Sequence, residues 1–335
     1  MNRRTFIEGS AAAIAVAATA GISAAIADEP AQNRVCQVLG IEKPVIQASM
    51  SGLTSPELCA AVSNAGGLGI IAAVDAETIE AVKALTDKPF AVTSYYFDDD
   101  ILATLKDEGV GIIFLLGMGS KESDYAVDTA TIGMLKENGF TVMFRDVNTT
   151  VPALIAAQDA GADIVIASGY GQGGHMTETR ITLSSMLAEA RPQITVPLVA
   201  SGCIVDEATA AAAAALGAEG AYCGTRFNAS IESPCSDAAK QVILDARAED
   251  LVEWKGVLGF VRANDCALAQ KCIEMTNAGA DRQEISDVYQ MMWVNGMAGG
   301  DVENWAVGMD DAVNSITELK SCADIVEDIA KGFGC

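Results

Sequence analysis

Basic residues, histidine and aromatic side chains are scarce in this chain. Its 335 residues include 21 Lys and Arg against 45 Asp and Glu, one histidine, and only 5% aromatic residues. The net charge of −24 repels polyanions, which excludes nucleic acid and anionic membrane surfaces as main partners. The nine cysteines form no CxxC pair and have no cluster of histidines beside them, so the sequence predicts no metal site.

Small and apolar residues are abundant instead, and they are arranged in an alternating pattern beyond residue 40. Short, continuously apolar runs, typical of parallel strands covered on both faces, alternate with stretches of helical spacing. The predicted strands are 45–48, 69–72, 90–94, 111–116, 141–145, 163–167, 197–201 and 220–224. The predicted helices are 55–65, 76–85, 99–107, 123–138, 150–160, 182–190 and 206–216.

Eight βα units in this order predict an α/β fold, a (β/α)8 TIM barrel. A doubly wound open sheet is the alternative, but the GxGxxG fingerprint that often accompanies it does not follow the first strand. Several predicted helices begin after a residue that can cap them, namely Ser55, Asp75, Asp98, Thr149 and Asp206. Several end at a glycine, at positions 66, 109, 139, 161 and 217.

The first 27 residues are predicted to be a twin-arginine-type export signal. Arg3 and Arg4 precede a mild apolar run, and residues 25–27 form a small-x-small cleavage site. The run is too short and too weakly hydrophobic for a membrane span, so we expect cleavage and no stable membrane insertion afterwards. The mature protein is then periplasmic or extracellular, where Cys266 and Cys272 are a candidate disulfide pair.

The mature chain is predicted to have three parts. Residues 36–235 form the barrel, and residues 236–305 form a mostly helical insertion. The bulky apolar residues at 291–297 belong either to the core of this insertion or to a lid over the barrel mouth. Residues 306–335 close the barrel with a last amphipathic helix at about 316–330.

Barrel enzymes carry their chemistry at the C-terminal ends of the strands. His175, the single histidine, follows the strand 163–167 at the tip of a glycine-rich run. An imidazole suits proton transfer near neutral pH, and the glycines permit close approach to a ligand; the alternative is a loop histidine with a structural hydrogen bond. The turns at 202–203 and 224–225 follow the last two strands, where barrels bind phosphate. The pattern predicts a phosphorylated cofactor whose reactive ring faces His175.

Several longer motifs resemble the nitronate monooxygenase family and the related FMN-dependent enoyl-ACP reductases, from about residue 36 to the end. They are 39–47, 61–69, 173–175, 196–202, 216–220 and 224–227. The resemblance implies a TIM barrel that binds FMN without a covalent bond and oxidises alkyl nitronates with oxygen. It implies His175 as the base or the group that orients the substrate. The implied FMN-binding residues are Gln47, Ala48, Met50, Thr93, Gly169, Gly174, Ser201, Gly202, Cys203, Gly224 and Thr225.

The chain departs from the family pattern at three places. Gly171 and Gln172 replace a Glu-Ala pair, Thr93 replaces an Asn, and Cys203 replaces a second glycine. Loss of a carboxylate beside His175 removes a group that could raise the pKa of its imidazole.

Two alternatives to nitronate oxidation stay open from the sequence. One is an exported FMN-dependent reductase of an activated C=C bond or similar acceptor, and the other is a non-catalytic flavin-binding protein. The high negative charge disfavours an acidic carrier protein as partner, so we expect a small-molecule substrate, a nitronate or similar. The sequence leaves the oligomeric state open.

Overall fold

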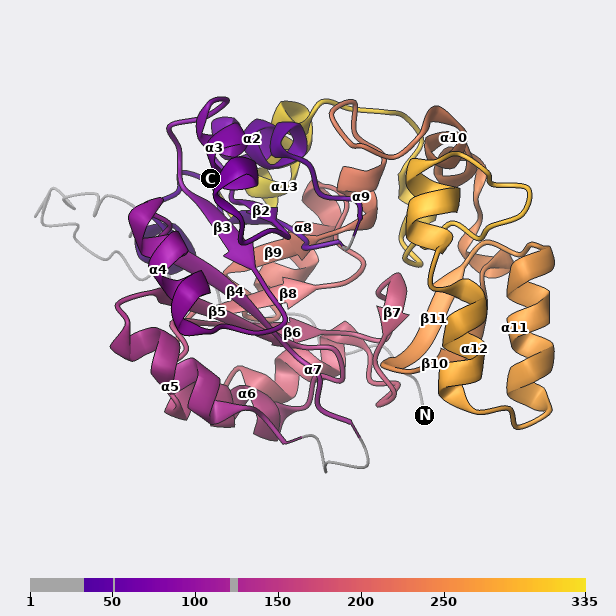
Figure 1. Cartoon of the computed structure of the whole chain (residues 1–335), viewed down its shortest axis with the longest axis horizontal. Coiled ribbons are helices and arrows are strands. Elements are labelled where there is room, and N and C mark those ends of the chain that lie inside the picture. The colour runs from indigo at the N-terminus through magenta and orange to yellow at the C-terminus, as the bar shows by residue number, and fades with distance from the viewer. Residues whose placement is uncertain (1–32, 51, 121–125) are drawn as a thin grey trace, which may run out of the picture. The chain divides into compact units, whose positions relative to one another are not determined.

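Eight parallel strands form a sheet that closes on itself (Figure 1). The computed structural model describes residues 33–50, 52–120 and 126–335. The strand order is β1-β9-β8-β6-β5-β4-β3-β2. The amide of Gln47 donates to the carbonyl of Leu68, and the amide of Leu68 donates to the carbonyl of Val45, so that β1 is joined to the residue before β2. The strands are β1 (Val45–Gln47), β2 (Gly69–Ile71), β3 (Phe90–Thr93), β4 (Ile112–Gly117), β5 (Thr141–Asp146), β6 (Ile164–Ser168), β8 (Leu198–Ser201) and β9 (Gly220–Cys223). The predicted TIM barrel is confirmed, and the alternative prediction of an open sheet is wrong.

The predicted helices connect these strands. They are α2 (Pro56–Asn64), α3 (Ala76–Lys83), α4 (Asp99–Asp107), α5 (Thr129–Glu137), α6 (Val151–Asp159), α7 (Leu183–Ala190) and α8 (Glu207–Ala215). The helix α5 begins later than predicted, because Asp128 caps it; residues 123–125 lie outside the described residues. The five glycines predicted to end helices all have a left-handed backbone, with φ between 69° and 104°.

The side chains of Ser55, Asp75, Asp98 and Asp206 accept hydrogen bonds from backbone amides of the helices that follow them, as predicted. The prediction of Thr149 as a cap is wrong. Thr150 caps α6, because the Thr149 hydroxyl donates to the carbonyl of Asp146 instead.

Both ends of the described chain close the barrel. Helix α1 (Arg34–Leu39) contributes Val35, Cys36 and Leu39 to the buried cluster that fills the barrel interior beside Phe114 and Met143. Helix α13 (Cys322–Gly332) packs against α8 and α2. It begins later than the predicted start near residue 316, because Ser321 caps it at the amide of Asp324.

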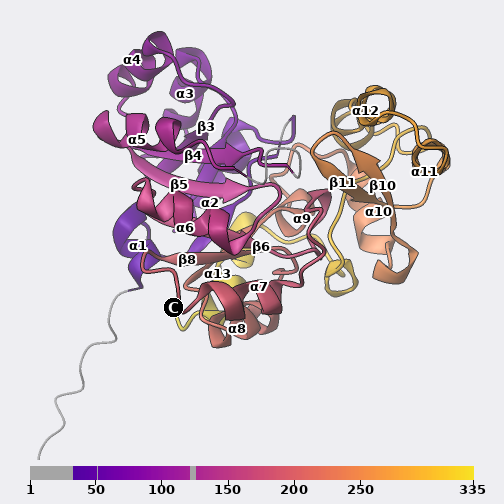
Figure 2. The same ribbon diagram turned by 90° about the horizontal axis from the view of Figure 1, so that it is seen from below.

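The prediction of a mostly helical insertion missed a β-hairpin. Strands β10 (Val252–Gly256) and β11 (Gly259–Ala263) pair antiparallel, and β11 also pairs with β7 (Gly174–Met176) in the glycine-rich run. Helices α11 (Ala267–Asn277) and α12 (Arg282–Tyr289) cover the side of the hairpin away from the barrel (Figures 1 and 2). Trp254 and Val261 of the hairpin are buried with Cys272 and Ile285 of these helices.

Further short elements surround this hairpin. They are α9 (Thr225–Asn228), α10 (Asp237–Asp245), η1 (Ala248–Asp250), η2 (Met292–Ala298), which has π-helical hydrogen bonds, and η3 (Val313–Ser315). Of the bulky apolar residues at 291–297, Met292 and Met297 are in the core, whereas Trp293 lines the pocket described below. This segment therefore serves both core packing and the barrel mouth.

All nine cysteines lie in the described residues, and each is a free thiol. The predicted pairing of Cys266 with Cys272 is therefore not formed. No helix within the described residues has the length and apolar character that crossing a membrane requires. The predicted export signal, residues 1–27, lies outside the described residues, and the predicted boundaries of the three parts stay a prediction.

Candidate active site

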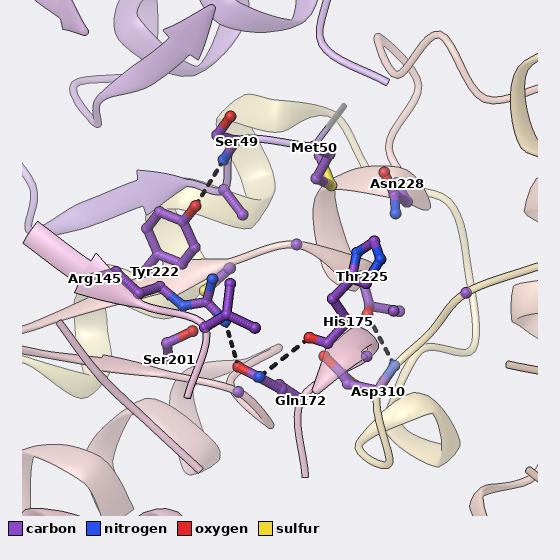
Figure 3. Close-up of a pocket in the computed structure, with 18 of the residues that line it drawn as sticks. Ser49, Met50, Arg145, Gln172, His175, Ser201, Tyr222, Thr225, Asn228 and Asp310 are labelled. Carbon is purple, nitrogen blue, oxygen red and sulfur yellow. Dashed lines mark hydrogen bonds between the residues drawn. The ribbon is translucent and has the colours of Figure 1, made fainter. Parts of the chain in front are cut away.

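A pocket lies at the C-terminal ends of the barrel strands, where barrel enzymes carry their chemistry (Figure 3). It holds about 1040 Å³ of empty space, its open mouth included. The loops after β1, β6, β8 and β9 supply most of its lining. The hairpin turn, the helix η2 and the segment 308–310 complete it through Leu258, Trp293, Gly308 and Asp310.

Nine of the twelve predicted site residues line this pocket. They are Ala48, Met50, Gly174, His175, Ser201, Gly202, Cys203, Gly224 and Thr225. Gln47, Thr93 and Gly169 are not in its lining. The side chain of Gln47 is buried, where it donates to the carbonyl of Ala48 and accepts from the amide of Ile70. Thr93 ends β3, and Gly169 packs so closely on α7 that a Cβ there would lie 2.4 Å from the amide of Leu183.

The glycines in the run before His175 allow another segment of the chain, residues 309–311, to pack closely against it. A Cβ on Gly173 would lie 2.2 Å from the carbonyl carbon of Met309, and one on Gly171 would lie 2.6 Å from the Asp311 carboxylate. The predicted close approach of a ligand is therefore only part of the reason for these glycines. They let the segment 308–311 run directly beside the pocket, where the carbonyl of Gly171 accepts from the amide of Asp311.

His175 stands on β7, opposite Val261 of the hairpin. Its ring centre lies 5.6 Å from that of Trp293 and 6.3 Å from that of Tyr289, and no hydrogen bond joins its ring nitrogens to the described residues. Burial, and secondly the charge of Arg145, lower the pKa of His175 to about 4. The imidazole is therefore neutral at pH 7, and it is a weak base.

Arg145 is a pocket residue that the sequence analysis missed. It precedes the last residue of β5, and its guanidinium lies in the pocket beside Tyr222 and Gln172 (Figure 3). Gln172 accepts from Arg145 Nη2 (2.6 Å) and donates to the carbonyl of His175 (3.1 Å). A basic residue at the end of a strand predicted to be buried was the signal in the sequence that could have found it.

The two predicted phosphate turns meet at one end of the pocket. Gly202 and Cys203 have left-handed backbones, with φ of 95° and 60°, so the structure gives a non-glycine residue a strained conformation at position 203. The Thr225 hydroxyl accepts from the amide of Asp310 (3.0 Å). Asp310, which the sequence analysis also missed, is 5% exposed. Burial, and also the nearby Asp311, raise the pKa of its carboxyl to about 6.

The pocket fits a flavin mononucleotide. The Asn228 Oδ1 atom is buried without a hydrogen-bond partner among the described residues, so it can accept from a hydroxyl group such as those of the ribityl chain. Gly224 leaves space for a phosphate, because a Cβ there would first meet Ala48 Cβ and Met50 Sδ, both at 3.6 Å. The Thr225 hydroxyl and the turn amides can hold the phosphate, and the carboxyl of Asp310 can donate to it when protonated.

Known proteins share both the sequence pattern and this architecture. The profile of the family described as nitronate monooxygenase matches residues 32–119 and 122–332. The chain belongs to this family. It is 31% identical to a probable nitronate monooxygenase of Staphylococcus saprophyticus over 273 residues, which cover 68% of this chain and 76% of that protein.

Two further relatives carry other names. The chain is 34% identical over 240 residues to (3aS,4S,5R,7aS)-5-hydroxy-7a-methyl-1-oxo-octahydro-1H-indene-4-carboxyl-CoA dehydrogenase of Mycobacterium tuberculosis, covering 67% of this chain and 63% of that protein. The structure of FabK from Thermotoga maritima superposes with a TM-score of 0.80 and 31% identity, covering 91% of this chain and 97% of FabK. The protein is thus an FMN-dependent oxidoreductase.

We expect Gly224→Asp to empty the flavin site. The backbone at Gly224 has φ of −109°, which any residue can adopt, so the effect comes from placing a carboxylate where the phosphate binds. Gly224→Asn, of the same shape without the charge, is the matched control. FMN binding, followed by the visible flavin spectrum, should be at least tenfold weaker in the Asp variant than in the Asn variant. An Asp variant that stays yellow would refute this placement of the phosphate.

We expect Asp310→Asn to stabilise the FMN-free protein at pH 8. Because folding raises the pKa of Asp310 from 3.8 to about 6, the folded state is penalised above about pH 6 and not below about pH 4, where the carboxyl is protonated in both states. The gain should be about 2–3 kcal/mol at pH 8 and vanish near pH 4, measured by urea unfolding. The exposed Asp159→Asn is the control, with little change at either pH. An equal gain for Asp310→Asn at both pH values would contradict the assignment.

Proposed function

We propose that this enzyme oxidises alkyl nitronates with oxygen. The observation that carries the proposal is the neutral, weakly basic imidazole of His175, which is held in the pocket of a nitronate monooxygenase family member. A nitronate is already deprotonated and needs no strong base. A neutral nitroalkane must first lose its α-proton, and an imidazole with a pKa of about 4 is poorly matched to that task.

The residues of this chain then have distinct tasks. When bound, FMN accepts electrons from the nitronate and passes them to oxygen. Neutral His175 can donate a hydrogen bond from one ring nitrogen and accept one at the other, which orients a small polar group. Trp293 and Leu258 line the same pocket with apolar surface and exclude water around it. Of the two predicted roles of His175, as a base or as the group that orients the substrate, we propose the second.

A reaction at a carbon–carbon bond is the second candidate. It is supported by the carboxyl-CoA dehydrogenase relative from Mycobacterium tuberculosis and by the likeness to FabK. It would need a donor such as NAD(P)H or an external electron carrier. A single anaerobic titration separates the two candidates, because only the reductase accepts electrons from a nicotinamide.

The decisive experiment is anaerobic reduction of the bound flavin. We expect propionate 3-nitronate to bleach the flavin absorbance and NADH to leave it unchanged. With oxygen admitted, kcat/KM for the nitronate should be flat between pH 7 and 9, because the imidazole of His175 stays neutral throughout this range. Bleaching by NADH alone would move the protein to the reductases, and a flavin that neither reagent reduces would contradict both nitronate oxidation and a reductase fed by a nicotinamide.

The variant His175→Ala completes this experiment. It should keep its flavin spectrum, and its kcat/KM for the nitronate should fall, because the imidazole that orients the substrate is lost. His175→Asn is the matched control, since its amide retains a donor and an acceptor and should preserve more nitronate turnover than the Ala variant. Loss of FMN from both variants would mean that His175 holds the cofactor instead.

We also propose that the protein is exported through the twin-arginine route, on the basis of residues 1–27 of the sequence. In a bacterial host with this pathway, the chain should be found outside the cytoplasm without its first 27 or so residues. Arg3→Lys combined with Arg4→Lys should leave the full-length chain in the cytoplasm. Arg34→Lys, outside the signal, should be exported normally. Cytoplasmic retention of the unchanged full-length protein would overturn the proposal.

A further inference from the structure

Arg145 holds a positive charge in a fixed position inside the pocket. Its Nε donates to the Ser168 hydroxyl (2.8 Å), and its Nη2 donates to Gln172 Oε1 (2.6 Å). Its Cζ lies 5.7 Å from the centre of the Tyr222 ring. Figure 3 shows the guanidinium between Tyr222 and Gln172. Contacts on three sides therefore hold this cation in one orientation.

Within the part of the chain that the structure describes, no carboxylate lies at ion-pair distance from this charge. Among the described residues Arg145 forms no ion pair, whereas Arg262, whose side chain is 7% exposed, pairs with Glu253 (2.8 Å) and Asp311 (3.3 Å). The acid next to Arg145 in the chain, Asp146, accepts from backbone amides instead. Burial lowers the pKa of Arg145, whereas the nearby Tyr222 and Asp146 raise it. A partly buried cation without an ion-pair partner is unfavourable, and a negative ligand group would remove the penalty.

The position of Arg145 indicates which part of the ligand carries this negative group. The turns predicted to bind phosphate follow β8 and β9, next to Asp310. The charged residues that shift the pKa of Asp310 are Asp311 and Arg262, and Arg145 is not among them. Arg145 extends from β5 beside the buried Tyr222, at the strand ends that form the floor of the pocket. Trp293 and Leu258, which come from outside the barrel, line the opposite, outer part. A flavin ring system bound between these two parts would have Arg145 facing it, away from the turns that would hold the phosphate.

We propose that Arg145 stabilises the negative charge that FMN acquires on reduction and so raises the reduction potential of the bound cofactor. Addition of two electrons and one proton turns the neutral oxidised ring system into one with a single negative charge. In turnover these electrons come from the substrate, and in the experiment they come from dithionite. A fixed cation in a pocket of low dielectric stabilises the charged form selectively. The inference needs bound FMN and does not depend on which substrate is oxidised.

The test is the reduction potential of bound FMN, measured by anaerobic dithionite titration against a reference dye. Arg145→Gln should make two-electron reduction at least tenfold less favourable, which corresponds to a potential about 30 mV lower. Arg145→Lys keeps the charge and should stay closer to the unchanged protein than the Gln variant does. Arg247→Gln is the control for a surface charge, because its ion pair with Glu249 is largely exposed; its potential should not change.

The dissociation constants of oxidised and reduced FMN give a second measure of how Arg145 affects the reduction potential. If the Gln variant binds FMN too weakly for a titration, its Kd for oxidised and for reduced FMN are measured separately. The proposal requires the larger loss for the reduced form, because the two equilibria are linked. An unchanged potential, or equal losses for both forms, would overturn it. An unchanged potential with a raised KM for an anionic substrate would assign Arg145 to the substrate. Failure of nitronate to reduce the flavin would refute the proposed function and leave this measurement intact.

Discussion

The close passage of residues 308–311 beside the glycine-rich run is the constraint on which the site depends. Gly171 and Gly173 permit it, because a side chain at either position would collide with Met309 or with Cys203 and Asp311. The amide of Asp310 then reaches the Thr225 hydroxyl, and Gly308 packs on Trp293. One segment near the C-terminus thereby joins the phosphate turns, the strand that carries His175 and the helix η2 at the mouth. The pocket is assembled only when the last part of the chain is in place.

Burial gives the three ionisable groups of the pocket unusual properties. The imidazole of His175 stays neutral, the carboxyl of Asp310 keeps its proton up to about pH 6, and the guanidinium of Arg145 remains a cation without a counter-ion. These states suit one ligand. A neutral imidazole would orient the proposed anionic substrate without having to deprotonate it, a protonated carboxyl would tolerate a phosphate, and the Arg145 cation would stabilise the negative charge of a reduced ring. The absence of the usual glutamate before His175 is consistent with this arrangement, because a carboxylate there would have raised the pKa of the imidazole.

The barrel was predictable from the sequence to within a few residues. Strands such as 69–72 and 111–116 are continuous apolar runs, and helices such as α4 and α8 are marked by a capping aspartate and a following glycine. The hairpin β10–β11 was not predicted, because its short strands depend on pairing with β7 rather than on a local pattern. The family resemblance implied Gln47 as a cofactor residue, yet its side chain is buried and accepts a hydrogen bond from the amide of Ile70. Position at a strand end identified the right loops, but not which side chains turn toward the pocket.

The sequence by itself determined the order of strands and helices and the location of the glycine turns after the last two strands. These follow from periodicity, helix caps and glycines, which act between residues close together in the chain. Only the tertiary structure decided the charge states of the site. They depend on how deeply residues 145, 175 and 310 are buried and on which partners face them, and those partners come from segments far apart in the chain. The desolvation that lowers one pKa and raises another exists only once the barrel and the returning segment enclose the pocket.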